Sequence, residues 1–204
     1  MAIVKLNDRG VRNVSTFGSV GAGSMVFIKK LTASTSGTLD FVDGTSDVVL
    51  DDTYKEYIFT FKDIHGSATG QFGFQGNAAS GSGFNETMTT TNFRVFQNEA
   101  GTDSELAYVA DEDQAQGTGL TLIAQTIDTD NDSNLVGYLH LFNPSSTTFV
   151  KHFISRIGVM KSGDSAANTF AAGYFNTTSA IDEIQFKFNS GNIDAGDICL
   201  YGIK

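Results

Sequence analysis

The pattern that most constrains the fold of this chain is an alternation of apolar and polar residues with a period of two. It occurs in short runs, and turn residues lie between them. Residues 57–62 and 184–188 place aromatic or aliphatic side chains at every second position. Successive side chains of a β-strand point to opposite faces of a sheet, so this alternation is typical of strands with one buried face. Similar short runs follow one another along the chain, at 25–31, 38–42, 71–75, 87–95, 120–127, 135–141 and 198–203.

Helical patterns are weak by comparison. No segment of ten or more residues keeps apolar positions at helical spacing behind a capping residue. The best helical fragment, 166–172, lies between Gly163 and Gly173, which confine it to a turn or two. Many short strands with turn signals between them predict an all-β fold, an antiparallel β-sandwich that resembles a jelly roll.

The composition agrees with such a fold. The chain has 22 Gly and a single Pro, and Gly tolerates the positive φ angles of tight turns. Its 17 Phe can supply a large aromatic core. We expect the glycine-rich segments 66–70 and 76–83 to be exposed loops at one end of the sandwich. Cys199, the only cysteine, lies in an apolar run and is expected to be a small buried residue without a disulfide.

The charge excludes two classes of partner. The formal net charge is −10 and the sequence has no basic run, which argues against nucleic acid and against an anionic membrane surface. No stretch approaches the ~20 apolar residues of a membrane-spanning helix. Residues 1–17 lack the continuous apolar segment of a signal peptide. We therefore expect a soluble protein that is made in the cytoplasm and is not exported by a standard signal.

The chain divides into a short arm and one larger domain. Residues 1–23 end in a Gly/Ser-rich run, which is typical of a hinge behind a segment that docks on a neighbour. A plain first strand followed by a turn is the alternative for this segment. Residues 24–204 are expected to form a single β-sandwich domain.

Residues suited to catalysis are scattered. His65, His140 and His152 are the only histidines, and neither a zinc spacing nor a Gly-x-Ser-x-Gly elbow before a helix is present. Two carboxylates facing each other across a cleft could hydrolyse a glycoside. Acidic candidates are common, however: Asp51, Asp52, Glu56, Asp111, Glu112, Asp113 and Glu183. Most of them are flanked by turn residues and are expected to be solvated. We expect no catalytic residue, no bound cofactor and no enzymatic activity.

One run resembles a metal-binding loop. Asp128, Asp130 and Asp132 alternate as the first ligands of a calcium loop do. The sixth position of the loop is Ser133 where Gly is usual, and the twelfth is Leu139 where Glu is usual. The two interpretations are a hydrated Asp/Asn hairpin loop and a calcium site built from the three aspartates.

Several segments also carry a resemblance to a known family. They are KLNDRGV at 5–11, the aromatic strand and His turn at 57–65, GFNET at 83–87, LFNPS at 141–145, YFN at 174–176, SGNIDAG at 190–196 and LYGI at 200–203. These segments are similar to those of a family of small virion structural proteins that tailed bacteriophages of marine bacteria encode. The resemblance covers nearly the whole chain. It implies a structural role in the virion, and it supplies no catalytic residues.

Two positions in a virion suit a compact acidic β domain. The first is a surface-exposed module of a tail appendage, tail fibre or baseplate, which assembles with other virion proteins and contacts the host. The second is a capsid decoration (cement) protein. The alternative from another class is a carbohydrate-binding module or polysaccharide depolymerase that acts on a host surface glycan, because fold alone does not determine function. A homotrimer is the expected assembly.

Overall fold

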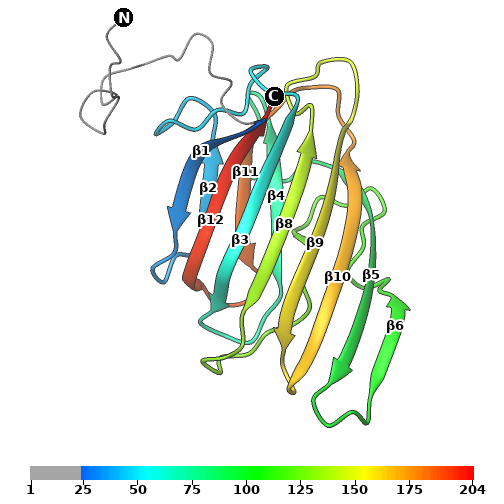
Figure 1. Cartoon of the computed structure of the whole chain (residues 1–204). Coiled ribbons are helices and arrows are strands. Elements are labelled where there is room, and N and C mark those ends of the chain that lie inside the picture. Colours follow the sequence, from blue (N-terminus) through cyan, green and yellow to red (C-terminus); the bar gives the residue numbers. More distant parts are fainter. Residues whose placement is uncertain (1–23) are drawn as a thin grey trace, which may run out of the picture.

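The computed structural model describes residues 24–204, and the arm expected at 1–23 lies outside these residues. The described chain consists of strands joined by turns and loops, which confirms the all-β prediction (Figure 1). None of its segments is a helix long and apolar enough to cross a membrane. The strands are β1 (Met25–Thr32), β2 (Leu39–Val42), β3 (Glu56–Gly66), β4 (Phe72–Ala78), β5 (Met88–Asn98), β6 (Ser104–Tyr108), β7 (Thr121–Leu122), β8 (Leu135–Phe142), β9 (Lys151–Lys161), β10 (Ser165–Phe175), β11 (Ile181–Phe188) and β12 (Ile193–Ile203).

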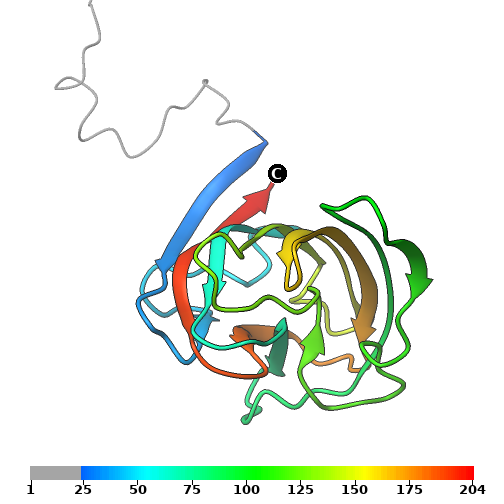
Figure 2. The ribbon, with the colours of Figure 1, turned by 90° about the horizontal axis from the view of Figure 1, so that it is seen from below.

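The strands form two antiparallel sheets that pack face to face (Figure 2). The large sheet has the order β1-β12-β3-β8-β9-β10-β5-β6, and the small sheet has the order β2-β11-β4-β7. The pairs β1–β12, β2–β11, β3–β8 and β4–β7 are nested, and successive pairs alternate between the two sheets. Nested pairing of this kind is the topology of a jelly roll. The predicted jelly-roll-like β-sandwich is therefore confirmed.

Two additional hairpins widen the large sheet. One is β9–β10, between β8 and β11, and the other is β5–β6, between β4 and β7. β10 pairs with β5 along its whole length, so the hairpins continue the large sheet past β8. The small sheet has only four strands against eight in the large sheet. Residues 109–127 cover the inner face of β5, where Gln114 N donates to Thr90 Oγ1 and Asn92 Nδ2 donates to Leu122 O.

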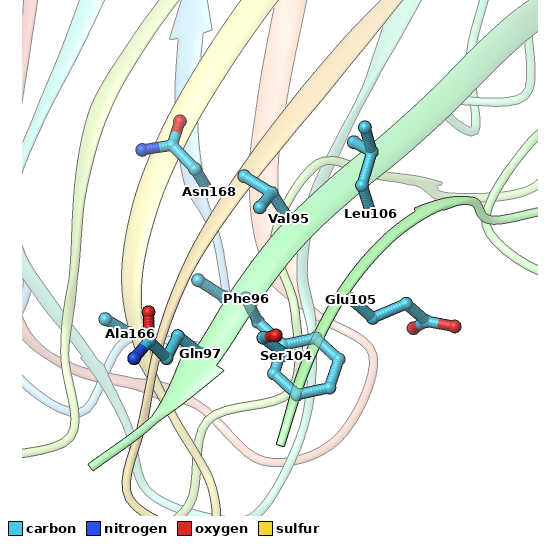
Figure 3. Close-up of a pocket in the computed structure, with 9 residues that line it drawn as sticks. Val95, Phe96, Gln97, Ser104, Glu105, Leu106, Ala166 and Asn168 are labelled. Atoms are coloured by element: carbon cyan, nitrogen blue, oxygen red, sulfur yellow. The ribbon is translucent and has the colours of Figure 1, made fainter. Parts of the chain in front are cut away.

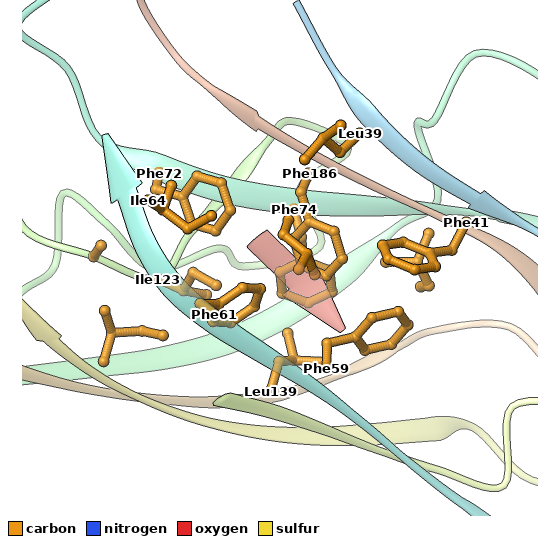
Figure 4. Close-up of a cluster of buried hydrophobic side chains, with 14 of the residues drawn as sticks. Leu39, Phe41, Phe59, Phe61, Ile64, Phe72, Phe74, Ile123, Leu139 and Phe186 are labelled. Atoms are coloured by element: carbon orange, nitrogen blue, oxygen red, sulfur yellow. The ribbon is translucent and has the colours of Figure 1, made fainter. Parts of the chain in front are cut away.

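The core between the sheets is built around Phe186 of β11 (Figure 4). Its ring centroid lies 5.1–6.2 Å from those of five other phenylalanines, Phe41, Phe59, Phe61, Phe72 and Phe74. These five rings come from β2, β3 and β4, so they join both sheets. Each close aromatic pair adds about 0.5–1.5 kcal/mol to the burial of apolar area. The alternation in 57–62 and 184–188 thus marks the strands that meet at the centre.

Strand β4 is buried along its whole length. Its polar outward residues are held by the segments that cover the small sheet: Gln75 Nε2 donates to Gly119 O at 2.9 Å, and Asn77 Oδ1 accepts from Phe84 N at 2.7 Å. Gly73 allows this close cover, because a Cβ atom there would lie 2.5 Å from Thr121 O. The sequence indicated the strand correctly, while the cover on its second face comes from distant segments.

Two predictions about local structure were wrong. The fragment 166–172 is strand, since β10 forms ladders with both β9 and β5 that override the helix propensity of its alanines. The glycine-rich segments 66–70 and 76–83 lie at opposite ends of the sandwich. β4 runs between them, so Ser67 bonds to Asn192 at one end while Ala79 bonds to Ala180 at the other. Gly76 itself belongs to β4 and is buried.

Two further expectations hold only in part. The run 120–127 forms strand only at β7, and the buried residues Ile123, Ala124 and Ile127 follow in irregular backbone. Cys199 has no disulfide partner within residues 24–204, but it is only partly buried. Its register partners on β1 and β3 are Lys30 and Thr60, so it projects away from the core.

We predict that Phe186→Ala lowers the free energy of unfolding by about 3–5 kcal/mol, because the substitution leaves a cavity that five rings line. Urea unfolding followed by circular dichroism measures this change. Phe149→Ala is the matched control, since that side chain is 68% exposed, and it should change stability by less than about 0.5 kcal/mol. Equal losses for the two variants would contradict this account of the core.

Candidate functional site

The three histidines lie apart and contact carboxylates, carbonyls or aromatic rings. His140 Nε2 lies 3.0 Å from Glu56 Oε2, and its ring packs on Phe142 with centroids 4.0 Å apart. His65 Nε2 lies 3.2 Å from Asp130 O. The exposed His152 lies beside Tyr174, at 5.6 Å between centroids. None of these partners is a serine or threonine hydroxyl or a thiol, so the structure gives the histidines no nucleophile to activate.

The calcium hypothesis falls on the loop between β7 and β8. Asp128 Oδ1 accepts from Asp130 N at 3.2 Å, which makes this part of the loop an Asx turn. The buried Ser133 accepts from Asp128 N and donates to Met160 O at 3.0 Å. Within residues 24–204, no three His, Cys, Asp or Glu side chains gather as a metal site would require. The loop is held by its own hydrogen bonds, and calcium binding by Asp128, Asp130 and Asp132 stays a prediction.

The calcium hypothesis has a direct test. If the loop binds calcium, titration calorimetry should show heat, and calcium should raise the melting temperature because it binds only the folded chain. Asp130→Ala should abolish both effects, whereas Asp103→Ala, at an exposed carboxylate in the β5–β6 turn, should leave them intact. Absence of heat and of a melting shift in the wild type would reject the site.

One carboxylate is buried against expectation. Glu112 is only 7% exposed and lies in the segment that covers the inner face of β5. Its oxygens accept from Gln125 Nε2 at 2.8 and 2.9 Å and from Gln71 Nε2 at 2.6 Å. Gln125 in turn accepts from Arg94 Nη1 at 2.6 Å. The solvated Glu112 expected from its flanking residues was wrong, because residues distant in the sequence enclose it.

The environment of Glu112 perturbs its acidity. Burial raises the pKa of its carboxyl above the ordinary value of 4.5, and the hydrogen bonds from Gln125 and Gln71 oppose part of that rise. Both oxygens are occupied by amide donors of the chain itself. The network therefore holds residues 109–127 to the widened part of the large sheet, and its chemistry is that of a buried structural contact.

We predict that Glu112 makes stability depend on pH in a defined direction. Because its folded-state pKa is raised, the folded chain keeps this proton to higher pH than the unfolded chain does. Its contribution to stability therefore falls as the pH rises from about 4.5 through the raised pKa. The melting temperature of the wild type should decline relative to that of Glu112→Gln between pH ~4 and ~7. Glu99→Gln, at an exposed carboxylate, is the control. If the difference in melting temperature between the wild type and Glu112→Gln stayed constant with pH, the prediction would be contradicted.

A second buried charge is Lys151 at the start of β9. Its side chain is fully enclosed, and Nζ donates to Phe149 O at 2.9 Å and to Thr177 O at 3.1 Å. Burial lowers the pKa of this amine. The two carbonyls belong to the loops before β9 and after β10, so Lys151 ties these loops together at one end of the sandwich.

The most distinctive surface is the side of the large sheet that points away from the small sheet, which we name the outer face. Figure 1 looks onto it. Ten large apolar side chains are exposed within residues 24–204. Phe149 lies in a loop, and the other nine project from the outer face. These nine are Met25, Phe27, Phe93, Val95, Leu106, Tyr108, Val136, Tyr138 and Ile154. Exposed apolar residues gathered in this way mark an interaction surface.

Cross-strand pairing sets the outer-face residues in rows. One row crosses all eight strands through Lys30, Cys199, Thr60, Tyr138, Arg156, Phe170, Phe93 and Tyr108. At its centre the rings of Phe93 and Phe170 stack, with centroids 4.8 Å apart and planes within 6°. Arg156 continues the stack, its Cζ 5.2 Å from the Phe170 ring, while its Nε donates to Asn168 Oδ1 at 3.0 Å. The row is thus pre-organised by contacts within the chain.

Shallow hollows flank this row on both sides. One, of about 450 Å³, lies over β10, β5 and β6, where Asn168, Val95 and Leu106 form the adjacent row (Figure 3). Another, of about 460 Å³, lies over β5, β10 and β9, where Ile154 and Tyr174 are among its walls. Both hollows are open to solvent, so they make the outer face uneven and suit a broad partner better than an enclosed small ligand.

The part of the outer face that β8, β9, β10 and β5 form carries little charge, whereas Lys30, Glu56, Lys62 and Asp197 project from β1, β3 and β12. The outward side chains of β8, β9, β10 and β5 include a single full charge, Arg156. The whole chain carries 23 acidic and 13 basic residues, so its excess negative charge lies elsewhere. Interface cores are depleted in charged residues and enriched in aromatic residues and Arg. This part of the outer face has this composition.

The sequence prediction did not identify this surface. It placed contacts in the loops, because it assumed that each strand has one polar face. The signal that could have found the outer face is the run 135–142, in which apolar residues occupy both sides of β8. An antiparallel strand that is apolar on both faces must be covered on both, and only one of these faces points to the core.

No protein-family model, curated protein or solved structure matches the chain. The resemblance to phage virion proteins therefore remains an expectation. The composition and geometry of the outer face are the main basis for a functional interpretation.

Proposed function

We propose that this chain is a non-enzymatic structural protein of a tailed bacteriophage particle, in which it serves as a surface-exposed β module of a tail appendage, fibre or baseplate. The observation that carries the proposal is the outer face, where nine exposed apolar side chains gather on one side of the large sheet. Covering apolar area stabilises an assembly by about 25 cal/mol per Å². A surface of this kind suits lasting contact with other proteins of a particle.

The arrangement of the ends gives the module a direction. Lys204 N donates to Ser24 O at 2.8 Å, so the described chain begins and ends at the same end of the sandwich. Attachment through residues 1–23 would leave the opposite end pointing outward. That end carries the turns at 67–71, 128–134 and 189–192, which are rich in Ser, Asn, Asp and Gly. These turns are the candidates for contact with a host surface.

Capsid decoration is the second position in the particle that the outer face suits, because a cement protein also needs a broad surface for its partner. The competing carbohydrate-binding or depolymerase function receives less support. Sugars stack on exposed ring faces; Phe170 lies between Phe93 and Arg156, so a glycan would have to use the exposed rings of Phe27, Tyr108 and Tyr138. Within residues 24–204, the hydrogen-bond partners of His65 and His140 are a carbonyl and a carboxylate, and both oxygens of Glu112 are occupied by amide groups.

The proposal is tested on purified particles. Cryo-electron microscopy should place the domain on the tail or baseplate, and quantitative mass spectrometry should count few copies, in small multiples of three or six for a trimeric or hexameric part. Hundreds of copies on the shell would support the decoration function in its place. Absence of the chain from particles, or cleavage of a host polysaccharide by the purified protein, would contradict a structural role.

A further inference from the structure

We infer that the outer face packs against the outer face of a second copy of this chain, so that two protomers form a face-to-face pair in place of the homotrimer expected from the sequence. The inference deepens the proposed function by naming the partner of the same surface. In such a pair each protomer contributes the same patch, which is the isologous arrangement of a two-fold dimer. The argument rests on the shape, charge and area of the outer face.

Shape favours a copy of the same sheet. Two sheets pack face to face about 10 Å apart with their strands within about 30° of each other, because both carry the same right-handed twist. Two copies of the large sheet have the same twist because they are the same chain. The small side chain of Ala166 borders one hollow beside Val95, and that of Ala172 borders the other beside Ile154. Projecting side chains of one copy can enter the hollows of the other.

Charge points to the same occupant. A chain with a net charge of −10 repels its own copies wherever its acidic surfaces meet. The outward side chains of β8, β9, β10 and β5 present Arg156 as their only full charge, and that cation already lies over the Phe170 ring. This part of the outer face thus lets two like-charged copies approach at low electrostatic cost. A strongly basic partner would bind an acidic surface, and the outer face is not acidic.

The area is sufficient for a stable dimer. Strands lie about 4.8 Å apart and rise about 3.3 Å per residue, so six strands over eight residues cover about 750 Å² of sheet. The large sheet has eight strands, and five of them have at least eleven residues. A standard interface buries about 800 Å² on each partner. Face-to-face packing of most of the outer face reaches that size.

The test is the mass of the purified full chain by size-exclusion chromatography with light scattering. The chain has a mass of 21.8 kDa, so we expect twice that mass for the wild type. Val95→Glu and Ile154→Glu each place a carboxylate in both halves of the proposed contact, at side chains 42% and 51% exposed. Each should weaken the dimer on the order of a hundredfold in dissociation constant.

Thr178→Glu is the matched control, since it adds the same charge at an exposed loop position and should leave the dimer unchanged. Circular dichroism and melting temperature establish that the variants remain folded. A monomeric or trimeric wild type, or a dimer that both outer-face variants preserve, would overturn the inference. A monomer that is nevertheless found in particles would overturn this inference alone, while a dimer absent from particles would support it and contradict the proposed function.

Discussion

The constraint on which this structure depends is the mismatch in width between its two sheets. Eight strands on one side face four on the other, so the small sheet can cover only half of the large one. A sheet face that is neither packed nor polar leaves apolar area in water, which costs about 25 cal/mol per Å². The jelly roll around Phe186 solves this for β12, β3 and β8, and Phe74 of β4 also packs on Phe153 of β9 and Phe175 of β10, while the inner face of β5 needs other cover.

On the inner side, irregular chain supplies that cover. Residues 109–127 lie across β5 and bring mostly irregular backbone and polar side chains with them, whose hydrogen-bonding groups need partners. Such groups are costly to bury without partners. This explains why Glu112, Gln125 and Arg94 form a connected hydrogen-bonded network here, whereas the core around Phe186 is built from aromatic and aliphatic side chains. The raised pKa of the Glu112 carboxyl therefore follows from covering the inner face of β5 with an irregular segment.

The sequence predicted what depends on local alternation and missed what depends on distant segments. Runs such as 57–62 and 184–188 are recognisable as strands because one of their faces is buried in a regular core. β10 was misread since its alanines lack a strong apolar signal, and only its two neighbours make it a strand. Glu112 looks solvated beside Asp111 and Asp113, and its burial arises from Gln71, which lies 41 residues away. The outer face was overlooked for a similar reason, as its rows combine residues from eight strands.

The two free edges of the large sheet show why association should proceed through its face. An exposed edge offers unpaired backbone groups to any other strand, and proteins protect such edges with charge, bulges or short length. β1 carries Lys29 and Lys30 and a register irregularity between Phe27 and Lys29. β6 is only five residues long and carries Glu105. Both edges thus have features that discourage strand addition, whereas the face between them carries apolar rows and little charge. A chain arranged in this way favours closed pairing through the face over open-ended growth through the edges.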